Sequence, residues 1–248
     1  MGGSRVVIVR LLHDPRLDAW LYPEDTPQSE ILDRYLSQPD FWNQLDAAHA
    51  LTLSYQGPEG AIHFILVNMT RAAEFRDFEE GLLGHELGHA WLAASGYQAL
   101  PFRPGPQACA ATVTSDIVQH ELLRAETARR GIDYRRYFTR LVESGPPVAG
   151  LTGCTRLIQL LHAVDAFETL SSQTWPGFDD YRRKLEAADP AAASEAARIA
   201  GELAKAKLED HEVYAGLMSR LEPRVTALYE GPRPSPEVGA QPTLTKEK

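Results

Sequence analysis

Residues 82–91 read Leu-Leu-Gly-His-Glu-Leu-Gly-His-Ala-Trp, and no other stretch of the 248-residue chain limits its fold and chemistry as strongly. Residues 73–94 contain no proline, carry apolar side chains at helical spacing and are followed by Ser-Gly, so they predict one helix. On that helix His85 and His89 lie one turn apart on the same face, where both imidazoles can bind a single metal ion. Glu86 lies beside this face and is expected to act as general base toward a water held by the metal. The stretch therefore predicts half of a catalytic zinc (Zn2+) site and, with it, the hydrolysis of an amide.

Gly84 and Gly88 lie inside the same predicted helix. Each costs about 1 kcal/mol of helix stability relative to alanine, so some other interaction must offset the loss. Paired small residues beside a buried site predict the close approach of a neighbouring backbone or of the substrate.

A catalytic zinc site has three protein ligands and one open position, so His85 and His89 need a third donor. Residues 108–131 predict the next long helix, and three of its side chains compete for this role. His120 is favoured, because the connection from His89 is long enough for the second helix to turn back antiparallel and to place His120 over the first two ligands.

The two alternatives to His120 on this helix are carboxylates. Glu121 would complete a His-His-Glu site and lies nearer the apolar stripe of the helix. Asp116 lies one turn before His120, which suggests either a carboxylate that orients a ligating imidazole or the reverse assignment. His162 lies among leucines in a later predicted helix and is a distant fourth candidate.

Residues 83–90 (Leu-Gly-His-Glu-Leu-Gly-His-Ala) resemble the active-site helix of the zincin metallopeptidases. This resemblance implies that His85 and His89 are zinc ligands, that Glu86 is the catalytic carboxylate, and that the helix packs beneath a small sheet. The metzincin extension is absent, because no histidine stands six residues after His89.

Residues 114–133 are similar to a region of uncharacterised bacterial H-E-x-x-H proteins. Those proteins have a His or an Asp at the distance of His120, followed by a Gly-aromatic-Asp ending. In this chain Ile132 replaces the aromatic residue, and Glu121 stands where a proline is frequent. The similarity implies that the third ligand comes from this region.

The pattern along the whole chain predicts an α+β fold that is predominantly helical, with a small sheet packed on the H-E-x-x-H helix as the zincin resemblance implies. One domain is expected over residues 1–230, its C-terminal part from about 150 being helical, and residues 231–248 predict a disordered tail. The predicted strands are 6–12, which is read as buried, and 51–55 and 61–68, which form a hairpin. The predicted helices are 29–36, 40–50, 73–94, 108–131, 151–171, 190–210 and 211–229.

Three further segments bear on a substrate. In zincins the strand near the active-site helix often presents an edge to which an extended substrate pairs, and residues 64–68 are the candidate by resemblance, with an interior strand as the equal alternative. The proline-rich residues 97–107 predict a loop over the mouth of the cleft. Tyr134, Tyr137 or a nearby arginine are candidates to stabilise an oxyanion, although core packing is the favoured role for them.

The composition limits which binding partners and which cellular compartment are expected. The 34 acidic and 25 basic residues give a formal net charge of −9, which disfavours nucleic-acid binding. The chain contains no apolar stretch of about 20 residues, and the apolar run near the N-terminus is too short and too charged for a secretory leader. Cys109 and Cys154 lie far apart without a C-x-x-C pattern, so no disulfide framework is expected and a reducing cytoplasm is favoured. Nothing in the sequence specifies an oligomeric state.

The function predicted from these features is that of a cytoplasmic zinc-dependent peptidase, which acts on a peptide or protein substrate. The alternative is a catalytically silent zincin-like fold that serves as a sensor or protein-binding module. The intact Glu86 favours the peptidase. A DNA-associated protease with the same chemistry is disfavoured by the acidic composition.

Overall fold

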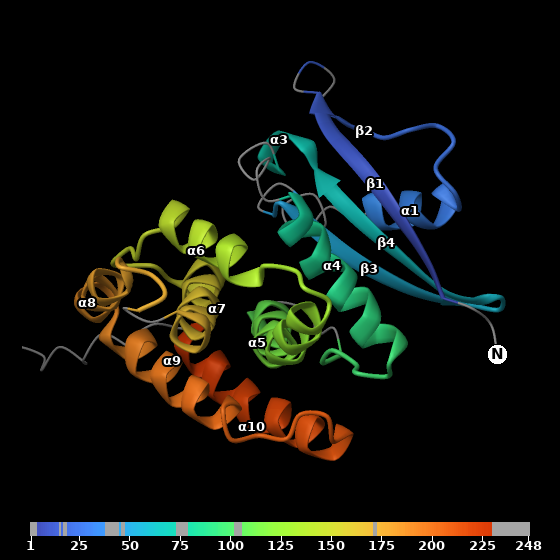
Figure 1. Ribbon diagram of the computed structural model, residues 1–248. Coiled ribbons are helices and arrows are strands. Elements are labelled where there is room, and N and C mark those ends of the chain that lie inside the picture. Colours follow the sequence, from blue (N-terminus) through green and yellow to red (C-terminus); the bar gives the residue numbers. More distant parts are fainter. Residues whose placement is uncertain are drawn as a thin grey trace, which may run out of the picture.

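A computed structural model of the chain describes residues 4–14, 16, 19–37, 45, 48–72, 79–101, 106–170 and 173–229. Within these ranges a small sheet with one helix on its outer face lies beside a larger group of helices, and α4 (Glu79–Ala94) lies between the two parts (Figure 1). The prediction of a predominantly helical α+β fold with a small sheet is confirmed. The expected helix over 40–50 and the tail over 231–248 fall mainly or wholly outside the described residues.

The sheet has the strand order β2-β1-β4-β3. Strand β1 (Arg5–Asp14) pairs parallel with β4 (Gly60–Asn68) and antiparallel with the short β2 (Ala19–Leu21). Strand β3 (Ala50–Gly57) pairs antiparallel with β4, which confirms the predicted hairpin. The strand that was a candidate for an open edge, residues 64–68, is therefore an interior strand, and β3 forms the edge of the sheet.

Strand β1 was predicted to be buried along its length, and this was wrong. Val9 and Leu11 are 2% and 0% exposed, whereas Val6 and Ile8 are 45% and 43% exposed. Successive side chains of a strand point to opposite faces, and α4 packs on β3 and β4. The continuous apolar run therefore fills the core on one face only.

The two faces of the sheet belong to two cores. On the outer face, α1 (Ser29–Leu36) packs Ile31 and Leu32 against Phe64 and Leu66 of β4. On the other face, Ile65 and Val67 join Leu82 and Leu92 of α4 in the core of the helical part. Alternation along β4 thus fixes which face receives the predicted zinc-binding helix.

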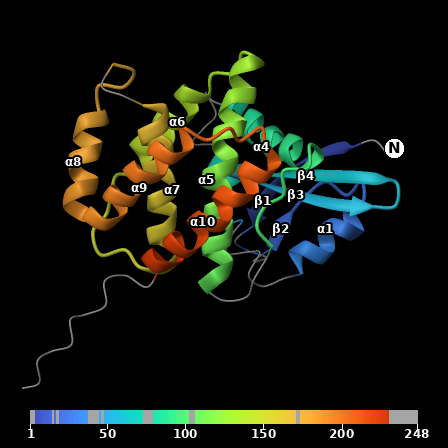
Figure 2. The ribbon, with the colours of Figure 1, turned by 90° about the horizontal axis from the view of Figure 1, so that it is seen from below.

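The helical part is built around α5 (Pro106–Arg129), which contacts α4, α7 and α10 and lies near the centre of Figure 2. The bounds of α1 and of α10 agree with the prediction, but the helix predicted over 190–210 ends at Leu203. The remaining helices are α3 (Met69–Ala72), α6 (Tyr134–Ser144), α7 (Gly153–Thr169), α8 (Phe178–Ala188), α9 (Pro190–Leu203) and α10 (His211–Tyr229).

Cys109 of α5 and Cys154 of α7 form a disulfide, contrary to the expectation from their spacing. The two cysteines are 45 residues apart in the sequence, but α5 and α7 pack against each other. Helix packing of this kind leaves no local signal in the spacing. The pairing also removes the reason for expecting a reducing compartment.

None of the helices in the described ranges combines the length and the apolarity that a membrane crossing needs.

Candidate metal centre

Helix α4 presents His85 and His89 toward the same point. Their Nε2 atoms lie 3.2 Å apart, and their rings meet at 77° with centroids 4.9 Å apart. Two nitrogens bound to one tetrahedral zinc at 2.0–2.1 Å would be separated by about 3.4 Å. The spacing of the two imidazoles therefore fits a shared cation.

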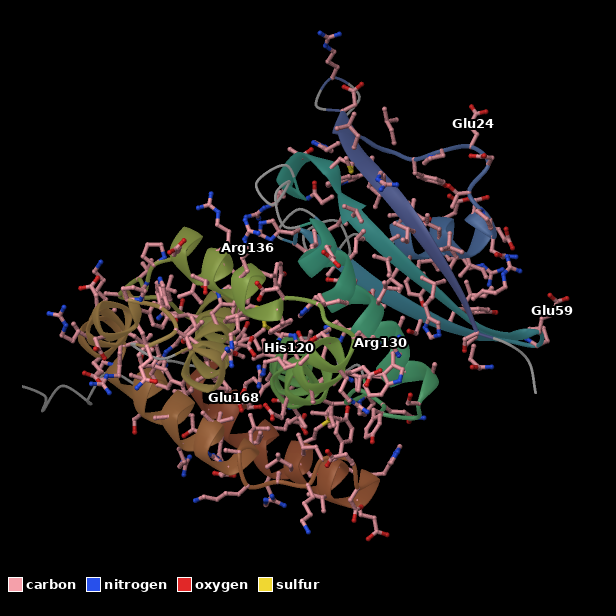
Figure 3. All side chains as sticks on the ribbon, viewed as in Figure 1. Glu24, Glu59, His120, Arg130, Arg136 and Glu168 are labelled. Carbon is pink, nitrogen blue, oxygen red and sulfur yellow. A yellow bond between two sulfur atoms is a disulfide. The ribbon has the colours of Figure 1, made fainter. Side chains whose placement is uncertain are left out.

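Helix α5 brings His120 to the same point. One ligand nitrogen from each of His85, His89 and His120 falls in a group whose members all lie within 4.8 Å of one another. His120 is 6% exposed and lies in the interior of the molecule, whereas Glu24 and Glu59 project outward (Figure 3). Of the sequence candidates for the third donor, His120 is the one whose ring lies beside the other two, with centroids 4.7 Å from His85 and 5.5 Å from His89.

Hydrogen bonds on the far side of two rings fix which nitrogen faces the centre. Nδ1 of His89 lies 3.1 Å from Oε1 of Gln119, whose amide nitrogen donates to the hydroxyl of Tyr214. Nδ1 of His120 lies 2.9 Å from Oδ2 of Asp165. Because both partners accept, each Nδ1 carries a proton, and in the neutral ring each Nε2 keeps its lone pair. This is the arrangement that ligating histidines have around zinc.

His85 differs from the other two rings. Its Nδ1 is buried and has no hydrogen-bond partner among the described residues, and its ring is stacked near Tyr134 with centroids 5.9 Å apart. Burial, with the neighbouring His120, lowers the pKa of His89 to about 3 and lowers the pKa of His85 well below its usual range. Both rings are therefore neutral at physiological pH, which is the state that binds a metal.

The pKa of His120 is affected both by burial and by the neighbouring carboxylate of Asp165, and the effect of Asp165 is the larger. Burial lowers the pKa of this ring, while the charge and the hydrogen bond of Asp165 raise it more, so the net direction is upward. Asp165 thus favours positive charge on or beside the ring, from a proton or from a metal cation.

Glu86 follows His85 on α4, lines the same cavity as the three rings and is 5% exposed. Its Oε2 accepts a hydrogen bond of 2.7 Å from the hydroxyl of Thr52 on β3, which also contacts the backbone oxygen of Glu86 at 3.0 Å. Burial raises the pKa of this carboxyl to about 7, although the Thr52 hydrogen bond opposes the shift. A carboxylate whose pKa lies near the working pH is suited to accept and to release a proton.

The three imidazoles and Glu86 line a cavity of about 850 Å³. Residues 50–54 of the edge strand β3 form one wall. Helices α6 and α7 supply an apolar wall that includes Phe138, Leu141 and Ile158. Tyr97, Gln98 and Ala99 of the predicted loop 97–107 also line the cavity, whereas residues 106 and 107 belong to α5.

The other candidates for the third donor are not part of the group of three imidazoles. Glu121 is turned away from the cavity and forms an ion pair of 2.6 Å with Arg124. Asp116 and His162 line the cavity, but the carboxylate that accepts the hydrogen bond of His120 is Asp165 of α7 and not Asp116, which we expected. The sequence placed Asp165 on a helix, but nothing local paired it with a residue 45 positions earlier.

Small residues in α4 allow the helices to pack closely around the site. A Cβ atom at Gly88 would lie 2.5 Å from Cγ of Leu123 on α5, and one at Gly84 would lie 3.0 Å from Cδ1 of Ile132. The predicted close neighbours are thus side chains rather than a backbone or a substrate. The short distance between α4 and α5 brings their imidazoles together.

Protein-family models, curated proteins and solved structures give no significant match to this chain. Inferences about its function therefore rest on the geometry of the three imidazoles, Glu86 and the cavity.

Proposed function

We propose that the protein is a zinc-dependent peptidase of the zincin type, with His85, His89 and His120 as the zinc ligands and Glu86 as the general base. The observation that carries the proposal is the convergence of three imidazoles beside a buried carboxylate in one cavity. The orientation of His89 by Gln119 and of His120 by Asp165 supports it.

The chemistry divides between the metal and the chain. When bound, zinc acts as a Lewis acid toward a carbonyl oxygen and lowers the pKa of a coordinated water toward about 7. Glu86 accepts the proton of the attacking water and returns it to the leaving amine. Thr52 holds the carboxylate of Glu86 in place through the 2.7 Å hydrogen bond.

The substrate is proposed to lie along β3. This strand forms one edge of the sheet in the described part of the chain and lines the cavity from residue 50 to residue 54, so its outer edge can pair with an extended peptide. Of the two tyrosines considered from the sequence, Tyr137 lines the cavity, with its ring 5.6 Å from that of His85. Its hydroxyl is proposed to donate to the oxyanion that forms during attack.

The proposal is tested by metal analysis together with hydrolysis of unfolded casein. We expect one zinc per chain in the wild type and in Glu86→Gln, and a loss of 10²–10⁴-fold in kcat for the variant, the usual contribution of a general base. A wild-type protein without zinc would overturn the proposal. Stoichiometric zinc with no cleavage by either protein would favour the alternative, a catalytically silent sensor or binding module.

A further inference from the structure

A buried chain of polar contacts leads from His120 on α5 to Asp165 on α7, which also lines the cavity, and on to Arg124. Oδ2 of Asp165 lies 2.9 Å from Nδ1 of His120, and Oδ1 of the same carboxylate accepts a hydrogen bond of 2.8 Å from Nη1 of Arg124. The side chain of Asp165 is 1% exposed and that of Arg124 is 12% exposed. Each oxygen of Asp165 thus has one partner, and the carboxylate cannot rotate without losing both.

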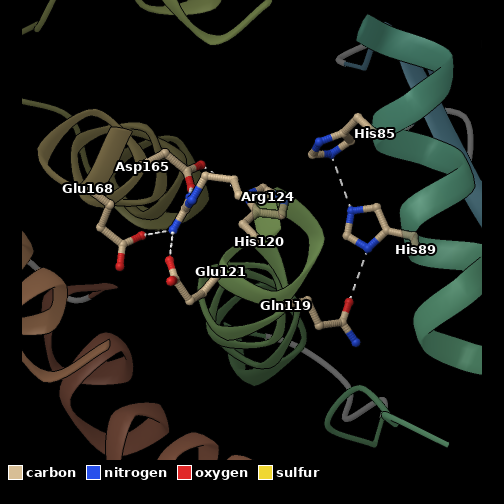
Figure 4. A network of polar contacts seen from close by, with 8 residues as sticks. All are labelled: His85, His89, Gln119, His120, Glu121, Arg124, Asp165 and Glu168. Carbon is tan, nitrogen blue, oxygen red and sulfur yellow. Dashed lines mark hydrogen bonds and ion pairs between the residues drawn. The ribbon is translucent and has the colours of Figure 1, made fainter. Parts of the chain in front are cut away.

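Arg124 contacts two further carboxylates through Nη2. Glu121 lies 2.6 Å away on the same helix, and Glu168 on α7 is the other partner. Figure 4 shows Arg124 between Asp165, Glu121 and Glu168, with Glu121 turned away from His85 and His89. One guanidinium therefore holds the carboxylate that contacts His120 and also the carboxylate that competed with His120 as a candidate ligand.

The spacing along the two helices explains the arrangement. His120 and Arg124 are four residues apart on α5, and Asp165 and Glu168 are three residues apart on α7, so each pair lies on one face of its helix. Where the two faces meet, a ring and a cation on α5 oppose two carboxylates on α7. The guanidinium has five donors in a planar fork, which suits contact with several carboxylates at once.

We propose that Arg124 is a positioning residue for the metal site: it fixes Asp165 against His120 and keeps Glu121 away from the metal. The inference rests on the proposed function, because it assumes that His120 binds zinc. Arg124 acts through Asp165 and does not contact the metal or the substrate.

The test compares zinc affinity and the visible spectrum of the cobalt(II)-substituted protein among variants. Arg124→Gln removes the fork, and we expect zinc affinity to fall by roughly 10- to 100-fold, the usual effect of losing a partner of a ligating histidine. The cobalt(II) absorption bands should shift, because the orientation of one ligand ring changes. Arg124→Lys keeps the buried positive charge, so this variant is expected to fold even if Arg124→Gln does not. Because a lysine cannot make the forked contacts, we expect a loss of zinc affinity intermediate between the wild type and Arg124→Gln.

Arg156→Gln is the matched control. Arg156 makes a buried bidentate pair with Asp189, at 2.6 and 2.8 Å, and neither residue lines the cavity of the proposed site. Its loss should lower stability as much as the change at Arg124 does, without altering zinc affinity or the cobalt spectrum. Glu121→Gln should also leave both unchanged.

The outcomes separate the two proposals. A wild-type protein that binds neither zinc nor cobalt(II) overturns the proposed function. A wild-type protein that binds both, with wild-type affinity and spectrum in Arg124→Lys and in any folded Arg124→Gln, overturns the role of Arg124 and leaves the proposed function standing. A drop in zinc affinity for Arg156→Gln as large as that for Arg124→Gln would show that the effect is general destabilisation, which also overturns the role.

Discussion

Burial raises the pKa of Glu86 from 4.5 to about 7 in the metal-free protein, and this shift has a consequence for stability. Unfolding releases the carboxyl to its ordinary pKa, so between pH 4.5 and 7 the folded state binds more protons than the unfolded state, and stability falls as pH rises. Above pH 7 the full cost, on the order of 3 kcal/mol, is present.

Glu86→Gln should therefore be more stable than the wild type at pH 8 when both are stripped of metal. At pH 4 the two proteins should differ little, because the carboxyl is neutral in both the folded and the unfolded state. Urea unfolding of chelator-treated protein at the two pH values measures the difference. Equal free energies of unfolding at pH 8 would contradict a buried, costly carboxylate.

Tyr137 and Tyr134 offer a matched pair for testing the oxyanion role. Tyr137 lines the cavity, whereas the hydroxyl of Tyr134 is buried and has no hydrogen-bond partner among the described residues. We expect Tyr137→Phe to lower kcat by roughly 10²-fold with zinc affinity unchanged, the usual effect of removing one oxyanion donor. Tyr134→Phe removes an unsatisfied buried hydroxyl and should leave kcat unchanged. Steady-state kinetics of the two variants on the same peptide substrate test the oxyanion role of Tyr137, and equal losses of kcat in the two variants would exclude it.

At the scale of the helices, the contact between α4 and α5 sets the geometry of the three imidazoles. A methyl group at residue 88 has no room, since its position is 2.5 Å from Cγ of Leu123. Gly88→Ala should push the helices apart, cost about 1–3 kcal/mol, and weaken zinc binding because two donors lie on one helix and one on the other. A Cβ atom at Gly201 on α9 would have no atom of the described residues beyond its own helix within 4 Å, so Gly201→Ala should stabilise the protein by up to about 1 kcal/mol. Thermal unfolding and zinc titration of both variants test this, and wild-type zinc affinity in Gly88→Ala would contradict it.

Which residues of the site the sequence could predict depends on how far apart along the chain the interacting residues lie. His85, Glu86 and His89 were predictable because their relation is set within one helical turn. The choice among Asp116, His120 and Glu121 was harder, because the helical period selects a core face only when one face is exposed. Residues 117–120 of α5 are all buried, so the period carried little information.

The sequence pattern could not predict contacts between residues from distant segments of the chain. The hydrogen bond between His120 and Asp165, the support of Glu86 by Thr52, and the parallel pairing of β1 with β4 all join segments far apart in the chain. Each depends on how elements pack. The same reason explains why β4 was a candidate for the edge strand and is in fact interior.

For the molecule as a whole, α5 and α7 form the frame on which His120, the proposed third ligand, is held. They are joined by the Cys109–Cys154 disulfide and by the contacts of Arg124 and His120 with Asp165. The sheet supplies Thr52 and the edge strand β3, along which we propose that the substrate lies, and both line the cavity with α4. The proposed zinc ligands thus come from two helices, and of these two the disulfide braces only α5, the helix that carries His120.

Removing the disulfide should therefore lower global stability more than it lowers metal affinity. Closing a loop of 45 residues stabilises a protein by about 4 kcal/mol in the chain-entropy description, so Cys154→Ser should lose a free energy of unfolding of that order. Zinc affinity should change by only a few-fold, because the orientation of His120 depends on Asp165 and not on the cysteines. Denaturant unfolding and zinc titration measure the two effects. A reductant should reproduce the loss in the wild type and have no effect on Cys154→Ser, whereas a wild-type protein unaffected by reduction would show that the two cysteines are not paired in solution.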